Sequence, residues 1–292
     1  MAAITVVGDA ALDVHAIPSR PLRAGGDVPA EIRLEPGGQG ANVAVRLARQ
    51  GHHARLVCAL GTDAAASLLR ERLAAERVEL IDAGATATSV VVVLRDANGE
   101  RTMLSQRVPL ARALSALPPD VGWLVVSGYL LLEADAEPRL GNGRHRALLG
   151  CSLALGEAAS WLDGARRVAP HLVVLNADEA RALRGADLPP AGLGAELAAR
   201  LDAVVVVTHA DGATAVIGPE AIGVPARSNG PAIDATGAGD AFAAGLIGAL
   251  VDRPWPPDRV GLEAAMATAI ELAGAVARAP GAQALVDGEN GA

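Results

Sequence analysis

The chain has 292 residues, of which 51% are hydrophobic and 20% charged, so it is too apolar to be disordered and long enough for one large domain or two small ones. Its formal charge of −8 argues against nucleic acid or an anionic membrane as a main partner. The Lys+Arg total of 25 consists of arginines alone, which excludes a Walker A P-loop, a Schiff-base lysine and a lysine general base.

The cysteines and the N-terminus point to an ordinary globular protein. Cys58 and Cys151 have no metal-ligand spacing, so neither a disulfide scaffold nor a zinc site is expected. No run of 18 apolar residues occurs, and Asp9 and Asp13 come too early for a signal peptide. We therefore expect a cytoplasmic protein with no membrane association.

Short β-branched runs alternate with Ala-, Leu- and Arg-rich amphipathic stretches along most of the chain. Near-continuous apolar strands separated by helices predict an α/β fold with a doubly wound, mostly parallel sheet flanked by helices, as one domain over residues 1–292. The predicted strands are Ile4–Val7, Arg55–Ala59, Trp123–Ser127, Leu172–Leu175 and Val204–Thr208. The predicted helices include Asn42–Gln50, Ala64–Arg77 and Ala177–Leu183.

Two early segments break this alternation. Residues 14–36 alternate polar and apolar side chains and are interrupted by Pro and Gly, and residues 88–107 contain a hairpin, Ser89–Arg95 and Arg101–Gln106, joined by 96–99. We expect both to form one small β-sheet that projects from the main domain. The last residues, 287–292, are expected to be a frayed tail.

Two motifs lie near the N-terminus. The first strand ends in Gly8-Asp9, and Asp13 follows, where it can accept hydrogen bonds from two hydroxyls or serve as a turn residue. Gly37-Gly38-Gln39-Gly40-Ala41-Asn42 leads into a helix. Asn42 at a helix start can bind a sugar hydroxyl, and Gly37 and Gly38 let a ligand lie on the backbone, although a turn with an Asn N-cap is about equally consistent.

Two further motifs follow later strands. Asn176 and Glu179 share a face of an opening helix and can hold Mg²⁺ through water, although an ordinary capping arrangement is the simpler interpretation of the motif alone. Thr208 to Gly212 follow the next strand and are expected to line a nucleotide pocket.

The strongest signal is Asp234-Ala-Thr-Gly-Ala-Gly-Asp240 before an Ala-rich helix. Backbone N–H groups of Gly237, Ala238 and Gly239 at a helix N-terminus can form an anion site, and Asp240 beside it is suited to accept a proton from an attacking hydroxyl. A role of Asp240 in capping alone is equally compatible with this motif by itself.

Together and in this order, these segments resemble the ribokinase-like (PfkB) family of carbohydrate and nucleoside kinases. The resemblance covers nearly the whole chain and implies a small β-sheet lid over the acceptor, with ATP as co-substrate and Mg²⁺ as cofactor. It implies that Asp240 is the catalytic base and that Gly237 to Gly239 form the anion hole. The acceptor positions it implies are Asp13, Gly37, Gly38, Asn42 and Glu133.

The resemblance also assigns the nucleotide and cation sites. Asn176, Thr208, Gly212, Gly237 and Gly239 match nucleotide positions. Glu179 matches the motif that organises Mg²⁺, and Asp234 and Thr236 fall where many members bind K⁺. A homodimer through the lid is a further possibility that the family implies.

Departures from the family pattern concern the acceptor side. Gln39 stands where many sugar-kinase members have lysine, and no aspartate ends the strand expected near Cys151–Leu155. A sugar is the expected acceptor. A nucleoside is the alternative, although none of the five aromatic residues lies in the expected lid, and Arg33, Arg95, Arg101 and Arg107 leave a phosphosugar open. A non-catalytic sugar-binding regulator is the least favoured possibility, since Asp240 and Glu179 are retained.

Overall fold

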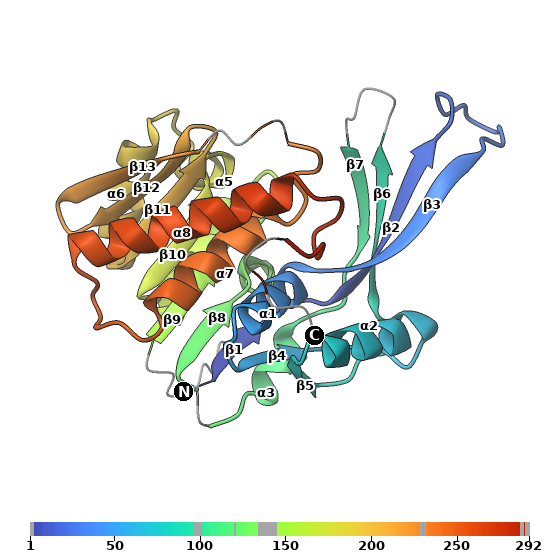
Figure 1. Cartoon of the computed structure of the whole chain (residues 1–292), viewed down its shortest axis with the longest axis horizontal. Coiled ribbons are helices and arrows are strands. Elements are labelled where there is room, and N and C mark those ends of the chain that lie inside the picture. Colours follow the sequence, from blue (N-terminus) through green and yellow to red (C-terminus); the bar gives the residue numbers. More distant parts are fainter. Residues whose placement is uncertain are drawn as a thin grey trace.

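Two sheets form the framework of the computed structural model, which describes residues 3–95, 101–119, 121–133, 145–227, 230, 232–286 and 289 (Figure 1). Within these residues the larger sheet has nine strands, in the order β13 (Glu220–Pro225), β12 (Gly212–Ile217), β11 (Val204–His209), β10 (Leu172–Asn176), β9 (His145–Leu149), β8 (Trp123–Val126), β1 (Ile4–Val7), β4 (Ala54–Cys58) and β5 (Glu79–Asp82). Every neighbouring pair from β11 to β5 is parallel, and β12 and β13 add an antiparallel edge. The predicted mostly parallel sheet is confirmed.

Helices cover both faces of this sheet, as Figure 1 shows for α7 and α8 in front of it. One face packs against α1 (Gln39–Arg49), α2 (Ala64–Ala75), α7 (Ala238–Leu250) and α8 (Arg259–Ala277). The other packs against α3 (Ala111–Ser115), the 3-10 turn η1 (Gly128–Leu132), α4 (Ala158–Val168), α5 (Ala177–Arg184) and α6 (Pro190–Leu201). Each face of the sheet thus has its own hydrophobic core. Adjacent residues of a strand point into opposite cores, as Val6 and Val7 of β1 do, so the strands are continuous apolar runs in the sequence.

The small sheet has the strand order β3 (Ala30–Gly37), β2 (Ala11–Pro18), β6 (Ser89–Arg95) and β7 (Arg101–Gln106), and it projects to the upper right in Figure 1. Both hairpin strands occupy the predicted residues, and the predicted turn 96–99 lies outside the described residues. Strand β2 begins four residues after β1 ends, and β3 leads through Gly38 directly into α1. The small sheet is therefore joined to the larger one at the carboxyl end of β1.

Several predicted boundaries were wrong. Helix α1 begins at Gln39 rather than Asn42, because Gly38 takes a left-handed φ of 94° and starts the helix there. No strand lies at Cys151–Leu155; the strand of that region is the earlier β9. The edge hairpin β12–β13 was not predicted, since glycine and proline interrupt its apolar pattern.

Two features near the C-terminus are also relevant. Helix α8 is long and apolar enough to cross a membrane by length and composition alone, yet it lies against α7 and the β12–β13 edge, and its Leu262 and Met266 belong to the core. The prediction of a frayed tail was wrong at Glu289, whose side chain is 1% exposed and forms an ion pair with Arg46. The other residues of that segment, 287–288 and 290–292, lie outside the described part of the chain.

Candidate active site

The carboxyl ends of the parallel strands lie along one edge of the larger sheet, where ligands bind in open α/β folds. Gln39, in the first turn of α1, connects two of these ends. Its Nε2 donates to the carbonyl of Gly150 at 2.8 Å, and its Oε1 accepts from the hydroxyl of Ser127 at 2.7 Å. The residue that stands in place of the family's lysine therefore ties β8 and β9 together at this edge.

Helix α7 brings Asp240 to the same edge. Gly237 caps the helix with a left-handed φ of 77°, and a side chain at this position would collide with Ala282. The amide of Ala238 donates to the carbonyl of Ala235 at 3.2 Å, so it is not free to bind an anion as predicted. In the described part of the chain, the backbone N–H groups of Gly239 and Asp240 donate to no acceptor. These two N–H groups are therefore free to bind an anion.

Asp240 is held by a chain of side-chain hydrogen bonds. The Nδ2 of Asn42 donates to Oδ2 of Asp240 at 2.8 Å, and the Nε2 of Gln283 donates to Oδ1 of Asn42 at 2.9 Å. Asn42 is only 5% exposed. Asn42 is therefore the fourth residue of α1 and not a helix start, and its amide contacts protein at both ends. One N–H of Nδ2 and one lone pair of Oδ1 remain, so its binding of a sugar hydroxyl stays a prediction.

The surroundings of Asp240 raise the pKa of its carboxyl to near neutral pH. Burial raises its pKa to about 7, and the negative charges of Asp9, Glu179 and Asp13 act in the same direction. The hydrogen bond from Asn42 opposes this shift. A carboxylate with a pKa near 7 accepts a proton far more readily than one with the ordinary value of 3.8.

A pocket of about 190 Å³ lies between Asp240 and the small sheet. Its polar walls come from the end of β1, the start of α1, the inward face of the small sheet, η1, and the first turn of α7 with the loop before it. The lining residues are Asp9, Ala11, Asp13, Gly38, Gln39, Ser89, Val91, Val93, Met103, Ser105, Arg107, Tyr129, Thr236 and Asp240. Val91 faces Ser105 and Val93 faces Met103 across β6 and β7, so one face of the hairpin covers this pocket.

Asp13 lies beside Gly37 and Gly38, as predicted. Both glycines are in close contact with the protein itself. Asp13 is 9% exposed, and burial together with the nearby Asp9 and Glu35 raises its pKa to about 7. A side chain at Gly37 would collide with the carboxylate of Asp13. A side chain at Gly38 would lie 2.8 Å from the carbonyl of Asp9, so both glycines are required by the protein's own packing.

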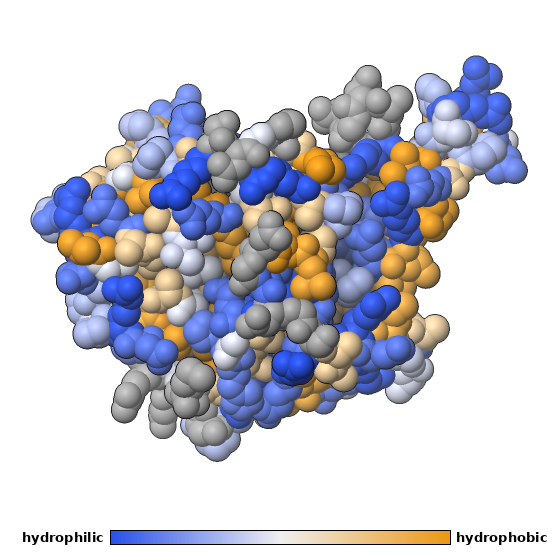
Figure 2. Space-filling view, in the orientation of Figure 1, coloured by the Kyte–Doolittle hydropathy of each residue, from blue (hydrophilic) through white to orange (hydrophobic). Residues whose placement is uncertain are grey.

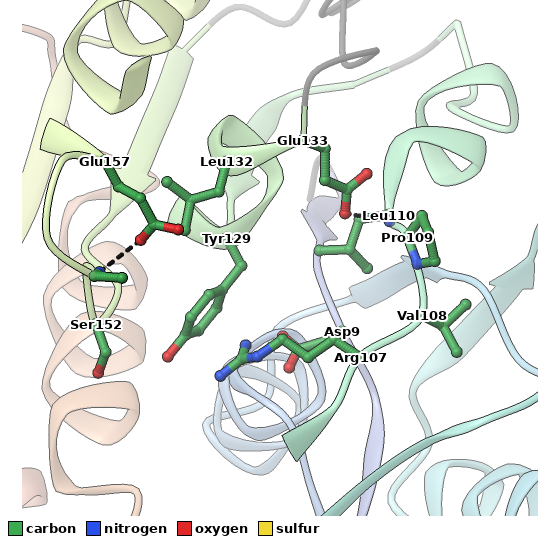
Figure 3. A pocket seen from close by; sticks show the side chains of 11 residues that line it. Asp9, Arg107, Val108, Pro109, Leu110, Tyr129, Leu132, Glu133, Ser152 and Glu157 are labelled. Atoms are coloured by element: carbon green, nitrogen blue, oxygen red, sulfur yellow. Dashed lines mark hydrogen bonds between the residues drawn. The ribbon is translucent and has the colours of Figure 1, made fainter. Parts of the chain in front are cut away.

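A second pocket, of about 430 Å³, adjoins the first and shares Asp9, Arg107 and Tyr129 with it (Figure 3). The guanidinium of Arg107 lies 3.7 Å from the centroid of the Tyr129 ring, a cation–π contact at the boundary between the two pockets. The positive charge of Arg107 opposes the effect of burial, which raises the pKa of Asp9.

Glu133 lines the second pocket and not the first. Its two carboxylate oxygens accept from the amides of Leu110 at 2.6 Å and Ala111 at 2.8 Å, at the start of α3 (Figure 3). The structure thus gives Glu133 a capping role and places it away from the wall that carries Asp240.

A third pocket, of about 590 Å³, lies beyond the ends of β10 and β11 and contains Asn176 and Thr208. These two residues are paired in the register of β10 and β11, so the sheet itself sets them side by side. Gly212 does not line it: with φ of 139°, it lies against the carbonyl of Val224 in the β12–β13 hairpin, where a side chain would not fit. Gly212 therefore lies outside the lining of this pocket, and its contact with a nucleotide stays a prediction.

Glu179 and Asn176 form a capping box at the start of α5. Oε2 of Glu179 accepts from the amide of Asn176, and Oδ1 of Asn176 accepts from the amide of Glu179, both at 2.8 Å. The described residues hold no cluster of three metal-ligating side chains. A single carboxylate oxygen beside bound phosphates nevertheless suits Mg²⁺, which keeps several waters, so Glu179 fits a water-mediated role.

Asp234 and Thr236 do not fit a potassium site as predicted. Oδ1 of Asp234 accepts from the amide and the hydroxyl of Thr236 at 2.9 and 2.6 Å. Its Oδ2 lies 3.0 Å from Nη2 of Arg95 on β6. A guanidinium therefore already neutralises this carboxylate, whose pKa is lowered by the hydrogen bonds from Thr236 and by Arg95 despite its burial.

Three residues of this region were not recognised from the sequence. The sequence assigns no site role to Asp9, although Asp9 lines both pockets next to β1. Tyr129 was noted as an aromatic outside the small sheet, and its position after β8 gave a signal that this sheet edge was near. No sequence pattern indicates a role for Gln283, because it lies several residues after α8 and contacts Asn42, which is 241 positions away in the sequence.

Comparison with known proteins identifies the family of the chain. The chain matches the pfkB family carbohydrate kinase over residues 1–287. It is 32% identical to the fructokinase of Klebsiella pneumoniae, covering 94% of this chain and 92% of that one. It is 30% identical to the bifunctional protein HldE of Pseudomonas aeruginosa, of whose length it spans only 58%.

Solved structures give the same result. The fructokinase of Vibrio cholerae, with fructose, ADP and calcium bound, has a TM-score of 0.78 at 25% identity, covering 97% of this chain and 95% of that one. The ribokinase of Thermotoga maritima has a TM-score of 0.79 at 22% identity, covering 97% and 95%, and shows the shared fold. The chain belongs to the PfkB family and is a carbohydrate kinase of the ribokinase-like fold.

Proposed function

We propose that the protein transfers the γ-phosphoryl group of ATP to a hydroxyl of a sugar, with Asp240 as the general base. The observation that carries this proposal is the position of Asp240. Its carboxylate stands in the first turn of α7, on the wall of the 190 Å³ pocket, with one oxygen held by Asn42. The other oxygen is left to accept the proton of an acceptor hydroxyl.

The acceptor is held by Asp13, with Asp9 and Ser105 on neighbouring walls. A carboxylate accepts from two adjacent hydroxyls, so Asp13 is suited to bind a vicinal diol. Positioning contributes most of the catalysis in phosphoryl transfer, because little covalent chemistry is left to the protein. Fructose is the first acceptor to test, given the relation to fructokinases.

The charge of the phosphates is neutralised without lysine. The amides of Gly239 and Asp240 at the N-terminus of α7 attract the transferring phosphoryl group, and Gly237 gives the loop its shape. Mg²⁺, held through water by Glu179, supplies further positive charge when bound. The nucleotide occupies the pocket that contains Asn176 and Thr208.

The small sheet acts as a lid that excludes water from the acceptor, which prevents hydrolysis of ATP. On the face opposite the pocket, its outer strands carry exposed apolar side chains, namely Ile32 at 56%, Leu34 at 56% and Leu104 at 57%. Figure 2 shows apolar surface on and below this sheet, on the right of the view. These side chains support a homodimer through the lid, which light scattering of the purified protein would detect.

A nucleoside is the second candidate acceptor, and one observation favours it. Tyr129 stands on the wall shared by both pockets, and the larger pocket is lined by apolar Val108, Pro109 and Leu132 (Figure 3). A base attached to a sugar in the first pocket would enter the second.

The test is a coupled assay of ADP formation with ATP, Mg²⁺ and a panel of sugars, sugar phosphates and nucleosides. Acceptor-dependent ADP formation, with the phosphorylated product identified by mass spectrometry, supports the proposal. Tight binding of a sugar without turnover would instead indicate a non-catalytic regulator.

A further inference from the structure

Three side chains of α1 form a stripe that faces the segment after α8. Asn42, Arg46 and Arg49 are spaced by four and three residues, which places them on one face of the helix. All three are buried, with exposures of 5%, 0% and 4%. Polar side chains so deeply buried need partners, and the segment after α8 supplies them.

The two arginines hold the backbone on both sides of Gln283. Nη2 of Arg46 donates to the carbonyl of Ala282 at 2.7 Å, and Nη1 of Arg49 donates to the carbonyl of Ala284 at 3.2 Å. Both guanidinium groups also contact the carboxylate of Glu289, at 2.5 and 3.4 Å. Gln283 is thereby fixed against the same helix face, where its Nε2 reaches Oδ1 of Asn42.

We propose that Gln283 is a positioning residue for phosphoryl transfer: by donating to Oδ1 of Asn42, it keeps the Nδ2 of that amide directed at Asp240. The inference rests on the proposed role of Asp240 as general base. It concerns a residue 43 positions away in the sequence that lines neither the acceptor pocket nor the nucleotide pocket.

The physical reason lies in the two unlike ends of an amide. If the Asn42 side chain were rotated by half a turn, its Oδ1 would face Oδ2 of Asp240, and two acceptors would repel unless Asp240 were protonated. In its observed orientation Gln283 presents Nε2, which is a donor only, so the rotated Asn42 would also set two donors against each other unless the Gln283 amide rotated as well. The observed pair of orientations is therefore the one in which Asp240 can remain ionised.

This selection matters because the other charged groups around Asp240 act mostly in the opposite direction. Asp9 after β1, Asp13 on β2 and Glu179 on α5 all favour its protonated form. Arg107, after β7, is the arginine among the described residues that line the same pocket. The N–H of Asn42 is the contact that favours the carboxylate.

The test uses Gln283→Glu, whose carboxylate can only accept and so selects the rotated orientation of Asn42. The acid limb of kcat/KM is expected to move up by about one pH unit, so that the rate at pH 6 falls about tenfold while the rate at pH 9 changes little. Gln283→Met, which removes the donor without adding charge, is expected to move the limb in the same direction by less. The KM for ATP should not change.

A double-mutant cycle with Asn42→Ala separates positioning from the added charge. If Gln283 acts through Asn42, Gln283→Met has no further effect in the Asn42→Ala background, and Gln283→Glu has only the effect of its charge. Leu285→Ala, an exposed change in the same segment, is the matched control and should leave the profile unchanged. A loss that is equal at every pH, or a full shift that persists without Asn42, would overturn the proposal.

A readout that needs no turnover completes the test. The carboxyl carbon of Asp240, assigned by its absence in Asp240→Asn, is titrated by NMR in the full chain and in each Gln283 variant. If the wild type phosphorylates none of the acceptors, the proposed function fails, while this titration still decides whether Gln283 controls Asp240. An unchanged Asp240 pKa in both Gln283 variants would refute the inference alone.

Discussion

Arg95, on strand β6 of the small sheet, places Nη2 at 3.0 Å from Oδ2 of Asp234, in the loop that leads to α7. This ion pair joins the small sheet to the loop that carries the anion site. Asp234 is 8% exposed, so its charge needs a partner, and the guanidinium supplies one. The guanidinium of Arg95 therefore brings positive charge to the loop in which the family resemblance implies a K⁺ site.

We accordingly expect activity without potassium. Replacing KCl by tetramethylammonium chloride at constant ionic strength should change kcat by less than about twofold, because the guanidinium is a permanent cation. Arg95→Ala should create a dependence on K⁺, since it exposes Oδ2 of Asp234. Arg33→Ala, which removes an exposed arginine of the same sheet, serves as the control. A wild-type enzyme that is inactive without K⁺ would contradict this assignment.

The role of Asp240 is tested by Asp240→Asn, which keeps the shape of the side chain but cannot take up a proton. We expect kcat to fall by about 10² to 10⁴. The same substitution should make the protein more stable at high pH. Because the pKa of Asp240 is raised in the folded state, its ionisation lowers the free energy of unfolding of the wild type as pH rises from 3.8 through about 7. Thermal unfolding should show Asp240→Asn to be more stable at pH 8, by about 2 kcal/mol after allowance for partial exposure, and little changed at pH 4.

The pH dependence of kcat/KM should have a steep acid limb near pH 7. Asp240 must be ionised to accept a proton, Asp13 must be ionised to accept from hydroxyls, and both have pKa values of about 7. The rate therefore falls as pH drops through 7, with a limiting slope between one and two. Asp13→Asn should reduce that slope to one. A limb centred near pH 4 would show that neither carboxyl is perturbed in the free enzyme.

Much of the fold was predictable because its signals are local. The strand Ile4–Val7 and the hairpin strands of the small sheet follow from runs of β-branched residues and from alternation, which depend on neighbouring positions. Strands β5 (Glu79–Asp82) and β9 (His145–Leu149) were not predicted, because charged residues or histidine interrupt their apolar pattern. Their pairing with β4 and β8 makes them strands, and no local pattern records that pairing.

The sequence predicts which residues gather at the site better than it predicts the contacts that each of them makes. Asp240 and Asp13 do meet at one pocket, since each follows a motif that sits at a strand end or helix start. The contact of Asn42 with Gln283 could not be predicted, because the Asn42 motif carries no sign of a residue 241 positions later in the chain. Arg95 likewise reaches Asp234 only through the folding of the small sheet onto the loop before α7.

Glu179 is expected to act through the metal and not through the acceptor. Glu179→Gln preserves the capping box, because glutamine fills that position as well as glutamate does, so α5 should remain intact. The Mg²⁺ concentration for half-maximal rate should rise, with sugar affinity in the absence of nucleotide nearly unchanged. Asp187→Asn, just beyond α5 at a side chain that is 95% exposed and outside the nucleotide pocket, is the control. Collapse of sugar binding with unchanged Mg²⁺ dependence would show that Glu179 belongs to the acceptor site.

The last prediction concerns Asp13, which holds the acceptor in the proposed function. Its carboxylate is nearly buried between Gly37 and the pocket, so loss of the carboxylate leaves bound hydroxyls without acceptors. Asp13→Ala should therefore lower kcat/KM for the best acceptor by about two orders of magnitude, as expected for one or two charged hydrogen bonds. The affinity for ATP without sugar should change little, because Asn176 and Thr208 line a separate pocket. Glu31→Gln, at an exposed carboxylate of the same small sheet, should leave both constants unchanged. Normal phosphorylation by Asp13→Ala would place the sugar elsewhere, with the second pocket beside Arg107 and Tyr129 as the next location to examine.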